Sequence, residues 1–254
     1  MVTAKQFETL MPDATELWSD EPEMESSQHY DQLALLVTCL EWNWRDRDDF
    51  FIGANLTVYY SRQQLRHREF LGPDFFLVRD TERRPRKSWV VWEENGRYPD
   101  LIIELLSTST ANVDRTSKME HYQNQFRTPE YFWFSPETLE FAGFRLVQQR
   151  YEPIVPDAQG QLWSRVLGYF LGIDNEELRF FTPDGDLLPT PGEAAEQAQQ
   201  QAHQQVEQAQ QQVEQAQQQA EQAQQQAEQE RLRAQRLAEQ LRALGIDPDA
   251  EEAT

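Results

Sequence analysis

The sequence predicts a mixed α/β domain, in which a mixed sheet is flanked by helices, followed by a long C-terminal helix or coiled coil. Three observations support this fold class: an apolar pattern at helical spacing near residue 30, a series of short apolar runs separated by turn residues, and a seven-residue repeat beyond residue 193. At 254 residues, the chain has room for one domain of ordinary size and an appendage.

The first element expected is an amphipathic helix at 27–45, because apolar residues recur there three and four positions apart. Short strand-type runs follow at 50–60, 75–78, 89–92, 101–106, 131–134 and 139–147. A second helix fits residues 114–126, between the fourth and fifth of these runs. The order of helix, strands, helix and strands is typical of a mixed sheet with helices on its faces.

The composition changes after residue 182, which we expect to end the domain formed by residues 1–182. Residues 183–192 are rich in proline and glycine and are expected to form a linker. From 193 to 245, Val, Ala and Leu recur at the a and d positions of a heptad repeat in a Gln/Ala-rich helix, and 246–254 is an acidic tail. The alanine seam fits a loose homodimer, a lone helix, or a helix that only spaces or solubilises the domain.

The net charge of -21 opposes non-specific binding to a polyanion such as DNA. Eight basic residues between Arg62 and Lys87 nevertheless leave a local basic surface, although an ordinary solvated loop would have the same composition. The single cysteine, Cys39, lies in an apolar run and indicates a reducing compartment. The sequence has neither a secretion signal nor an apolar run long enough for a membrane span, so we expect a cytoplasmic protein without a membrane partner.

The most informative stretch is 99–107, where Glu104 stands in the centre of an apolar strand. Strand alternation places Asp100 and Glu104 on the same face. A buried carboxylate needs a metal ion, a basic side chain or several hydrogen bonds. Asp74 begins the upstream apolar run 75–78, so two acids from adjacent strands can meet at one point.

Lys118 in the second expected helix supplies a cation for this point and shares a helix face with His121 and Tyr122. Two carboxylates can hold Mg²⁺ or Mn²⁺ and leave water molecules in place, while the lysine orients or deprotonates an attacking water. The structural alternative is that Asp74 and Asp100 cap turns, and Glu104 and Lys118 form a buried ion pair.

Four segments in this order resemble the Uma-two family of restriction-endonuclease-like proteins, within the PD-(D/E)XK nuclease superfamily. They are GPDFFLV at 72–78, YPDLIIELLS at 98–107, Asp114 with Lys118 and Tyr122, and TPEYFWF at 128–134. The resemblance spans residues 18 to 181. It implies a restriction-endonuclease-like core, with Asp74 and Glu104 as metal ligands, Lys118 as the catalytic lysine, and Mg²⁺-dependent or Mn²⁺-dependent hydrolysis of DNA as the activity.

One position departs from the superfamily pattern, because Leu106 stands where the lysine is usual, two residues after the acid. Lys118 must then act from the helix. Some members add an acid from the first helix or before it, for which Glu25 and Glu23 are candidates, with His29 nearby. Asp100 and Tyr122 are further tentative site residues. The alternative function is an inactive nuclease-like scaffold that assembles with partners through its helical tail.

Overall fold

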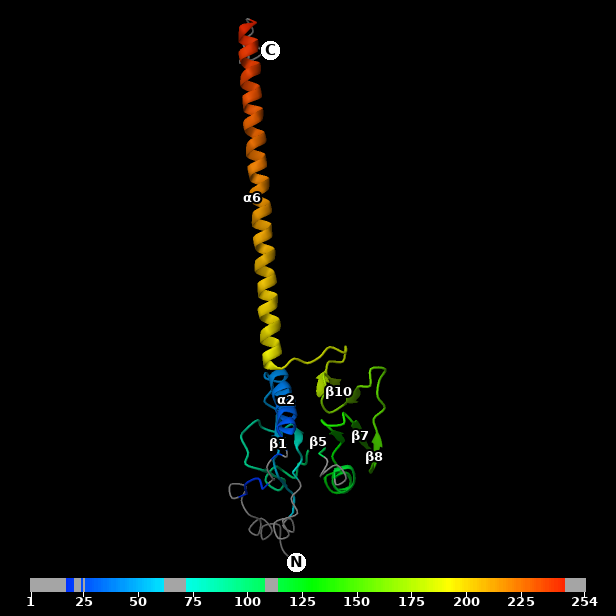
Figure 1. The fold of residues 1–254 in the computed structure, drawn as a ribbon. Coiled ribbons are helices and arrows are strands. Elements are labelled where there is room, and N and C mark those ends of the chain that lie inside the picture. Colours follow the sequence, from blue (N-terminus) through cyan, green and yellow to red (C-terminus); the bar gives the residue numbers. More distant parts are fainter. Residues whose placement is uncertain (1–16, 21–23, 25, 62–71, 108–113, 245–254) are drawn as a thin grey trace, which may run out of the picture. The chain divides into compact units, whose positions relative to one another are not determined.

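The computed structural model describes residues 17–20, 24, 26–61, 72–107 and 114–244 (Figure 1). The chain divides into two compact units, residues 1–193 and residues 194–254. The first unit is a mixed α/β domain and the second is a long helix, so the predicted fold class is confirmed.

A six-stranded sheet forms the centre of the first unit, with strand order β1-β3-β5-β6-β7-β8. Its strands are β1 (Phe50–Ala54), β3 (Phe75–Arg79), β5 (Leu101–Leu105), β6 (Glu130–Phe134), β7 (Phe141–Val147) and β8 (Arg150–Pro153). All neighbours are antiparallel except β5 and β6, which are parallel. The connection between these two strands contains a helical segment, residues 114–126, made of η2 (Asp114–Lys118), α5 (Met119–His121) and η3 (Tyr122–Phe126).

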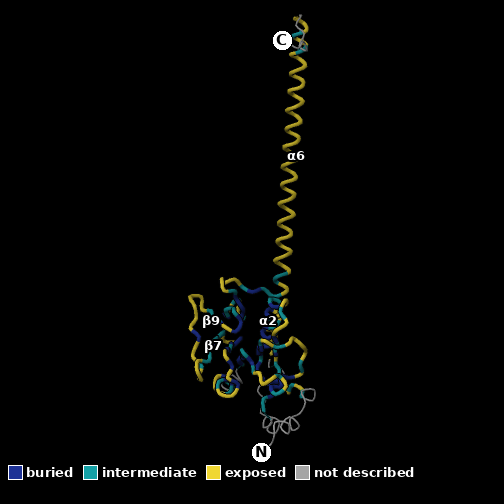
Figure 2. Tube along the Cα trace, turned by 180° about the vertical axis from the view of Figure 1, so that it is seen from behind, coloured by how far each residue is buried: buried dark blue, intermediate teal, exposed yellow. Residues whose placement is uncertain are grey.

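The two faces of this sheet carry separate apolar clusters. On one face, Leu101, Ile103 and Leu105 of β5 belong to a cluster with residues of α2 (Ser27–Asn43) and of a small sheet, β11-β10-β9. The small sheet consists of β9 (Leu162–Ser164), β10 (Tyr169–Asp174) and β11 (Glu177–Phe181). On the other face, Ile102 belongs to a cluster with Tyr122 and Phe126 of the helical segment and with the short parallel strands β2 (Val58–Tyr59) and β4 (Trp89–Val90). Figure 2 shows the buried residues gathered in this domain.

Several elements differ from those expected. The single run at 50–60 is two strands, because the backbone turns at Asn55, which has a φ of 45°. The strands β8 to β11 were not expected as separate elements. The helical segment 114–126 contains two wide π-helical turns in place of a regular α-helix.

The C-terminal part of the expected linker packs against the rest of the first unit. Leu188 is 3% exposed, and the side chain of Asn43 donates a hydrogen bond to the Pro189 carbonyl at 2.9 Å. The helix α6 (Pro191–Ala243) begins two residues earlier than expected, because Thr190 and Glu193 form a capping box. The Glu193 N–H donates to Thr190 Oγ1 at 3.2 Å, and the Thr190 N–H donates to Glu193 Oε2 at 2.7 Å.

From residue 194 onward, α6 has no buried residue, and it is yellow, the colour of exposed residues, along nearly its whole length in Figure 2. Its Ala, Gln, Glu, Leu and Arg residues are strong helix formers, so the helix does not depend on packing alone. Over the described residues, no helix has both the length and the apolar character needed to cross a lipid bilayer.

Candidate active site

The strand register brings Asp74 and Glu104 together. Phe75 pairs with Ile103 across the antiparallel strands β3 and β5, and one further step places Asp74 opposite Glu104. Side chains opposite one another in a sheet point to the same face. This is the face of Ile102, which the helical segment 114–126 covers, so the predicted direction of Glu104 agrees with the structure.

Two hydrogen bonds, each from a backbone N–H of one strand to the carboxylate carried by the other, fix this arrangement. The N–H of Leu105 donates to Asp74 Oδ2 at 2.7 Å, and the N–H of Asp74 donates to Glu104 Oε2 at 3.3 Å. Each carboxylate is therefore held by the strand that carries the other one. Because backbone N–H groups hold both carboxylates, their positions do not depend on a long, flexible side chain.

The helical segment supplies three residues at four-residue spacing. Lys118 Nζ lies 3.2 Å from Glu104 Oε2 and 2.9 Å from Asp114 Oδ1. The Tyr122 hydroxyl donates a hydrogen bond to Glu104 Oε1 at 2.7 Å. The structure thus brings the predicted residues Asp74, Glu104 and Lys118 into one cluster with Tyr122, and it adds Asp114, which the sequence analysis did not assign to the site.

His29, near the start of α2, reaches the same cluster. Its Nε2 lies 3.5 Å from Asp74 Oδ2, and its side chain is 8% exposed. The helix start is fixed by Ser26, whose hydroxyl oxygen accepts a hydrogen bond from the His29 N–H at 3.2 Å. His29 therefore contacts one of the two central acids from α2, an element separate from the helical segment that carries Lys118.

Burial and neighbouring charged groups together determine the protonation of this cluster. Glu104 is fully buried, and burial raises the pKa of its carboxyl well above the ordinary value, with the charge of Lys118 opposing this and that of Asp74 adding to it. Burial acts on Asp74 in the same direction, but the hydrogen bond from His29 and the charge of Lys118 outweigh it and lower the pKa of Asp74.

The remaining two groups keep their protons. Burial opposes the charged form of Lys118, yet the negative charges of Glu104 and Asp114 outweigh it and raise the pKa of the ammonium group. Burial and the nearby charge of Glu104 raise the pKa of the Tyr122 hydroxyl well above its ordinary value. Tyr122 is therefore a hydrogen-bond donor to Glu104, and Lys118 is a fixed cation.

The cluster has the composition of a site for a hard divalent cation. Three buried or nearly buried carboxylates, Asp74, Glu104 and Asp114, face one lysine, and when all three are ionised their negative charge exceeds the positive charge even if His29 is counted as a cation. Within the described ranges, no three His, Cys, Asp or Glu side chains converge as a ready-made metal cage. Mg²⁺ is commonly held by one or two carboxylates, with water completing its shell, and Asp74 and Glu104 fit this pattern.

Other predicted residues lie elsewhere or were not described. Asp100 is at the opposite end of β5 from Glu104, where it accepts a hydrogen bond from the Arg79 N–H at 2.8 Å, so it does not join the cluster. His121 contacts the rings of Tyr60 and Phe126. Glu25 and Glu23 fall outside the described residues.

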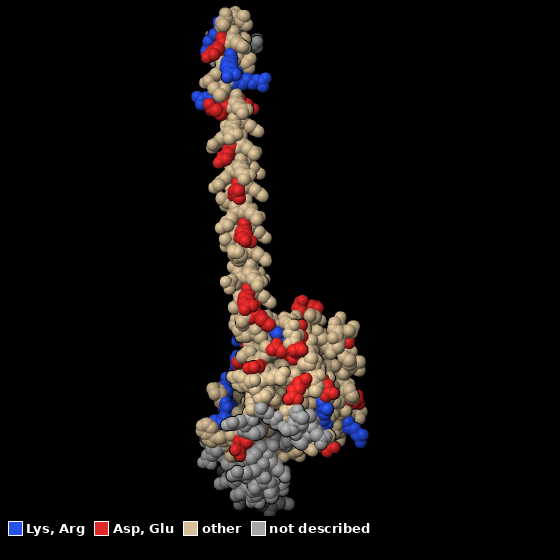
Figure 3. All heavy atoms as spheres, viewed as in Figure 1, with Lys and Arg blue, Asp and Glu red and all other residues tan. Residues whose placement is uncertain are grey.

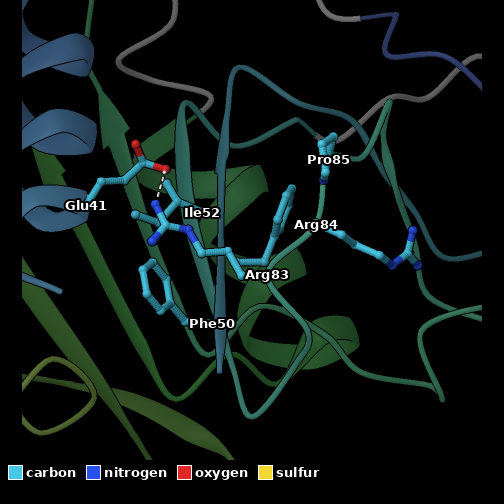
Figure 4. A pocket seen from close by; sticks show the side chains of 7 residues that line it. Glu41, Phe50, Ile52, Arg83, Arg84 and Pro85 are labelled. Atoms are coloured by element: carbon cyan, nitrogen blue, oxygen red, sulfur yellow. Dashed lines mark ion pairs between the residues drawn. The ribbon is translucent and has the colours of Figure 1, made fainter. Parts of the chain in front are cut away.

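Three arginines in the described part of the basic stretch, residues 72–87, form ion pairs with glutamates. Arg83 lies 3.4 Å from Glu41, and Arg84 and Arg86 lie 2.8 and 2.6 Å from Glu94. Arg83 lines a pocket of about 400 Å³ beside the edge strand β1. Figure 4 shows Arg83 in this pocket with its ion-pair partner Glu41. This pocket adjoins Phe50, at the end of β1 that pairs with Arg79, whereas Asp74 adjoins the other end of β3. It is separate from the acidic cluster.

Comparison with known proteins identifies the family. The Uma2 family model, described as "Putative restriction endonuclease", matches residues 5–174, which is more than half of the chain. Among solved structures, the chain is similar to a "putative nuclease" from Anabaena variabilis, with 14% sequence identity and a TM-score of 0.43, over 66% of this chain and 91% of that one. No curated protein matches the chain. With the order of segments seen in the sequence and a model match over residues 5–174, this chain belongs to the Uma2 family of restriction-endonuclease type.

Proposed function

We propose that this protein is a divalent-metal-dependent endonuclease that hydrolyses phosphodiester bonds in DNA, at the cluster of Asp74, Glu104 and Lys118. The observation that carries the proposal is a fully buried carboxylate, Glu104, paired across two strands with a second acid and contacted by a lysine. Family membership supports a nuclease of restriction-endonuclease type. The single buried thiol, Cys39, fits a reducing compartment, so we place the activity in the cytoplasm.

Asp74 and Glu104 would hold the cation, which we take to be Mg²⁺ or Mn²⁺. A bound divalent cation lowers the pKa of a coordinated water and neutralises charge that builds on a phosphate. Asp74 is ionised at neutral pH, because its pKa lies below the ordinary value. Its anchoring by the Leu105 N–H keeps the carboxylate on the face shared with Glu104.

Lys118 supplies a permanent positive charge beside Glu104. Since the surrounding acids raise its pKa, it donates hydrogen bonds and does not act as a general base near neutral pH. Its role is to orient an attacking water or a phosphate oxygen and to offset negative charge. Asp114 and Tyr122 hold Lys118 and Glu104 in place from the same helical segment.

The test is cleavage of supercoiled plasmid with Mg²⁺ or Mn²⁺ by the wild type, Lys118→Met and Lys87→Met. Both variants lose one positive charge, but Lys87 lies over the ring of Trp18, at 3.9 Å from its centre. We expect nicking by the wild type and Lys87→Met, and loss of nicking in folded Lys118→Met. Absence of cleavage by the wild type on any DNA form, cleavage of RNA alone, or equal activity of both variants would contradict the proposal.

A second candidate function is an inactive nuclease-like scaffold that assembles with partners through α6. The net charge of -21 and the exposed length of α6 favour it. In that case the purified wild type cleaves nothing and binds no Mn²⁺ by calorimetry, while deletion of residues after 193 still changes its assembly state.

A further inference from the structure

The helix α6 carries an apolar seam that nothing covers within the described part of the chain. Val206 and Val213 are 54% and 58% exposed and, with Ala209, line a shallow groove along the helix. The same seven-residue spacing continues to the end of the helix. The seam consists of Val206, Ala209, Val213, Ala216, Ala220, Ala223, Ala227, Ala234, Leu237, Leu241 and Leu244. A repeated apolar seam of this kind is the surface by which helices pair.

Charge is divided sharply along the same helix. Residues 194–230 contain six glutamates and no lysine or arginine, whereas residues 231–244 contain four arginines and one glutamate. Figure 3 shows acidic side chains along the helix and basic ones gathered near its C-terminal end. The heptad positions that flank the seam are mostly glutamine. The uneven distribution of charge along the helix is therefore the main electrostatic feature that a partner helix would meet.

The division of charge selects one orientation for a pair of identical helices. In a parallel pair, the acidic section lies beside the acidic section, and the basic section beside the basic one. In an antiparallel pair, each arginine-rich section lies beside a section that has no lysine or arginine, and in the register given below Glu207 is level with Arg236 of the other copy, which is attractive. Glu230 also occupies a heptad d position, so a parallel pair in register would bring two carboxylates into one layer of the seam.

The sizes of the seam residues favour the same orientation. The leucines are confined to the C-terminal part, Leu237 to Leu244, and alanine dominates the preceding part. A parallel pair would stack leucine on leucine at one end and alanine on alanine at the other, which demands two different helix separations. An antiparallel pair divides the leucines between the two ends of the coiled coil and sets them against smaller residues. One such register places Val206 opposite Leu237, and Ala202 opposite Leu241, of the second copy.

We propose that α6 pairs with the α6 of a second copy of this chain as an antiparallel two-stranded coiled coil. This pairing concerns the second unit alone and does not depend on the proposed nuclease activity. It makes the protein a homodimer in which the arginine-rich end of each helix lies beside the section of its partner that has no lysine or arginine.

Light scattering on the full chain tests the association. We expect twice the chain mass of 29.9 kDa for the wild type and for Gln211→Glu, which adds a negative charge outside the seam. Val213→Glu adds the same charge within the seam and should give the monomer mass, with helix content by circular dichroism unchanged. A monomeric wild type, a larger oligomer, or equal behaviour of the two variants would overturn the proposal.

Energy transfer between copies tests the orientation. One population carries a donor on Gln208→Cys and the other an acceptor on Gln235→Cys, while the buried Cys39 stays unlabelled. In a parallel pair these positions are about 40 Å apart along the axis, given the rise per residue of a helix. In the antiparallel register given above they are directly opposite. Strong transfer in this mixture supports the proposal, whereas strong transfer only between two Gln208→Cys copies shows a parallel pair and overturns it.

Discussion

Two buried glutamates in neighbouring strands should respond in opposite ways to the same substitution. Glu104 in β5 is the centre of the proposed site, and Glu130 in β6 lies outside it. Both are essentially inaccessible to solvent, at 0% and 1% exposed. We predict that Glu104→Gln loses activity and keeps its stability, and that Glu130→Gln loses stability and keeps its activity.

The hydrogen-bond partners of Glu104 can accommodate an amide. In Glu104→Gln, the new side chain can turn its oxygen toward Lys118 and the Asp74 N–H, and its NH₂ toward the Tyr122 hydroxyl, which can accept as well as donate. The cost of burying an ionised carboxylate disappears at the same time. We therefore expect the free energy of unfolding to change by less than about 1 kcal/mol.

The partners of Glu130 cannot accommodate an amide. Its Oε1 accepts from Arg145 and from the Arg165 N–H, both at 3.0 Å, and its Oε2 accepts from Ser164 and from the Val166 N–H. Either orientation of an amide sets its NH₂ against an N–H donor. Breaking a buried pair costs roughly 3–5 kcal/mol, and because Arg145 is 21% exposed we reduce this to roughly 2–4 kcal/mol.

Urea unfolding and plasmid cleavage, measured at a temperature where both variants are folded, compare the two directly. We expect cleavage by Glu104→Gln to fall by at least about a hundredfold, since loss of groups that only support metal ligands already costs roughly 10- to 100-fold. Cleavage per folded molecule should be unchanged in Glu130→Gln. Equal destabilisation of the two variants, or an inactive but folded Glu130→Gln, would refute this reasoning.

Three further outcomes follow from the structure. Burial raises the pKa of Asp100 despite the hydrogen bond from the Arg79 N–H, so its ionised form destabilises the fold at neutral pH. Asp100→Asn should therefore be more stable than the wild type at neutral pH in urea unfolding, and the difference should shrink on acidification and vanish below pH 3.8; a difference that grows on acidification contradicts this. Burial raises the pKa of the Cys39 thiol to about 11, so a colorimetric thiol reagent should react only as fast as the domain unfolds, and rapid reaction in native buffer would show that the site is open. Glu193→Ala removes the capping box and the nearer of the two acidic partners of the buried Arg179, and should cost roughly 1–2 kcal/mol in thermal unfolding, against no measurable change for the exposed Glu196→Ala.

The residues at the centre of the site could be predicted because each stands out in its own strand. Glu104 interrupts an apolar run, and Asp74 begins another, so strand alternation and adjacency were enough to expect them together. Asp100 shares the face of Glu104 but lies four residues away along β5, which is about 13 Å. Alternation gives the face and not the distance along the strand, and the structure places Asp100 at the other end.

The parts that were missed depend on contacts that local patterns do not record. Asp114 lies four residues before Lys118, so the two side chains could be expected on the same helix face. An acid at the start of a helix is, however, equally typical of an exposed helix, and so it did not indicate a site. The strand β8 is largely exposed and polar, with no apolar alternation to mark it, and it forms the edge of the sheet. The packing of the expected linker follows from Leu188 and from its contact with Asn43, which is far away in sequence.

Calorimetric titration of Mn²⁺ tests most directly whether Asp74 and Glu104 hold a cation. The wild type should bind one ion per chain, and Asp100→Asn, which removes an acid from the other end of β5, should bind equally well. Asp74→Asn should show no heat of binding at the same concentrations while remaining folded. Binding of the same strength by Asp74→Asn, or no binding by the wild type, would contradict a metal-dependent site at this cluster.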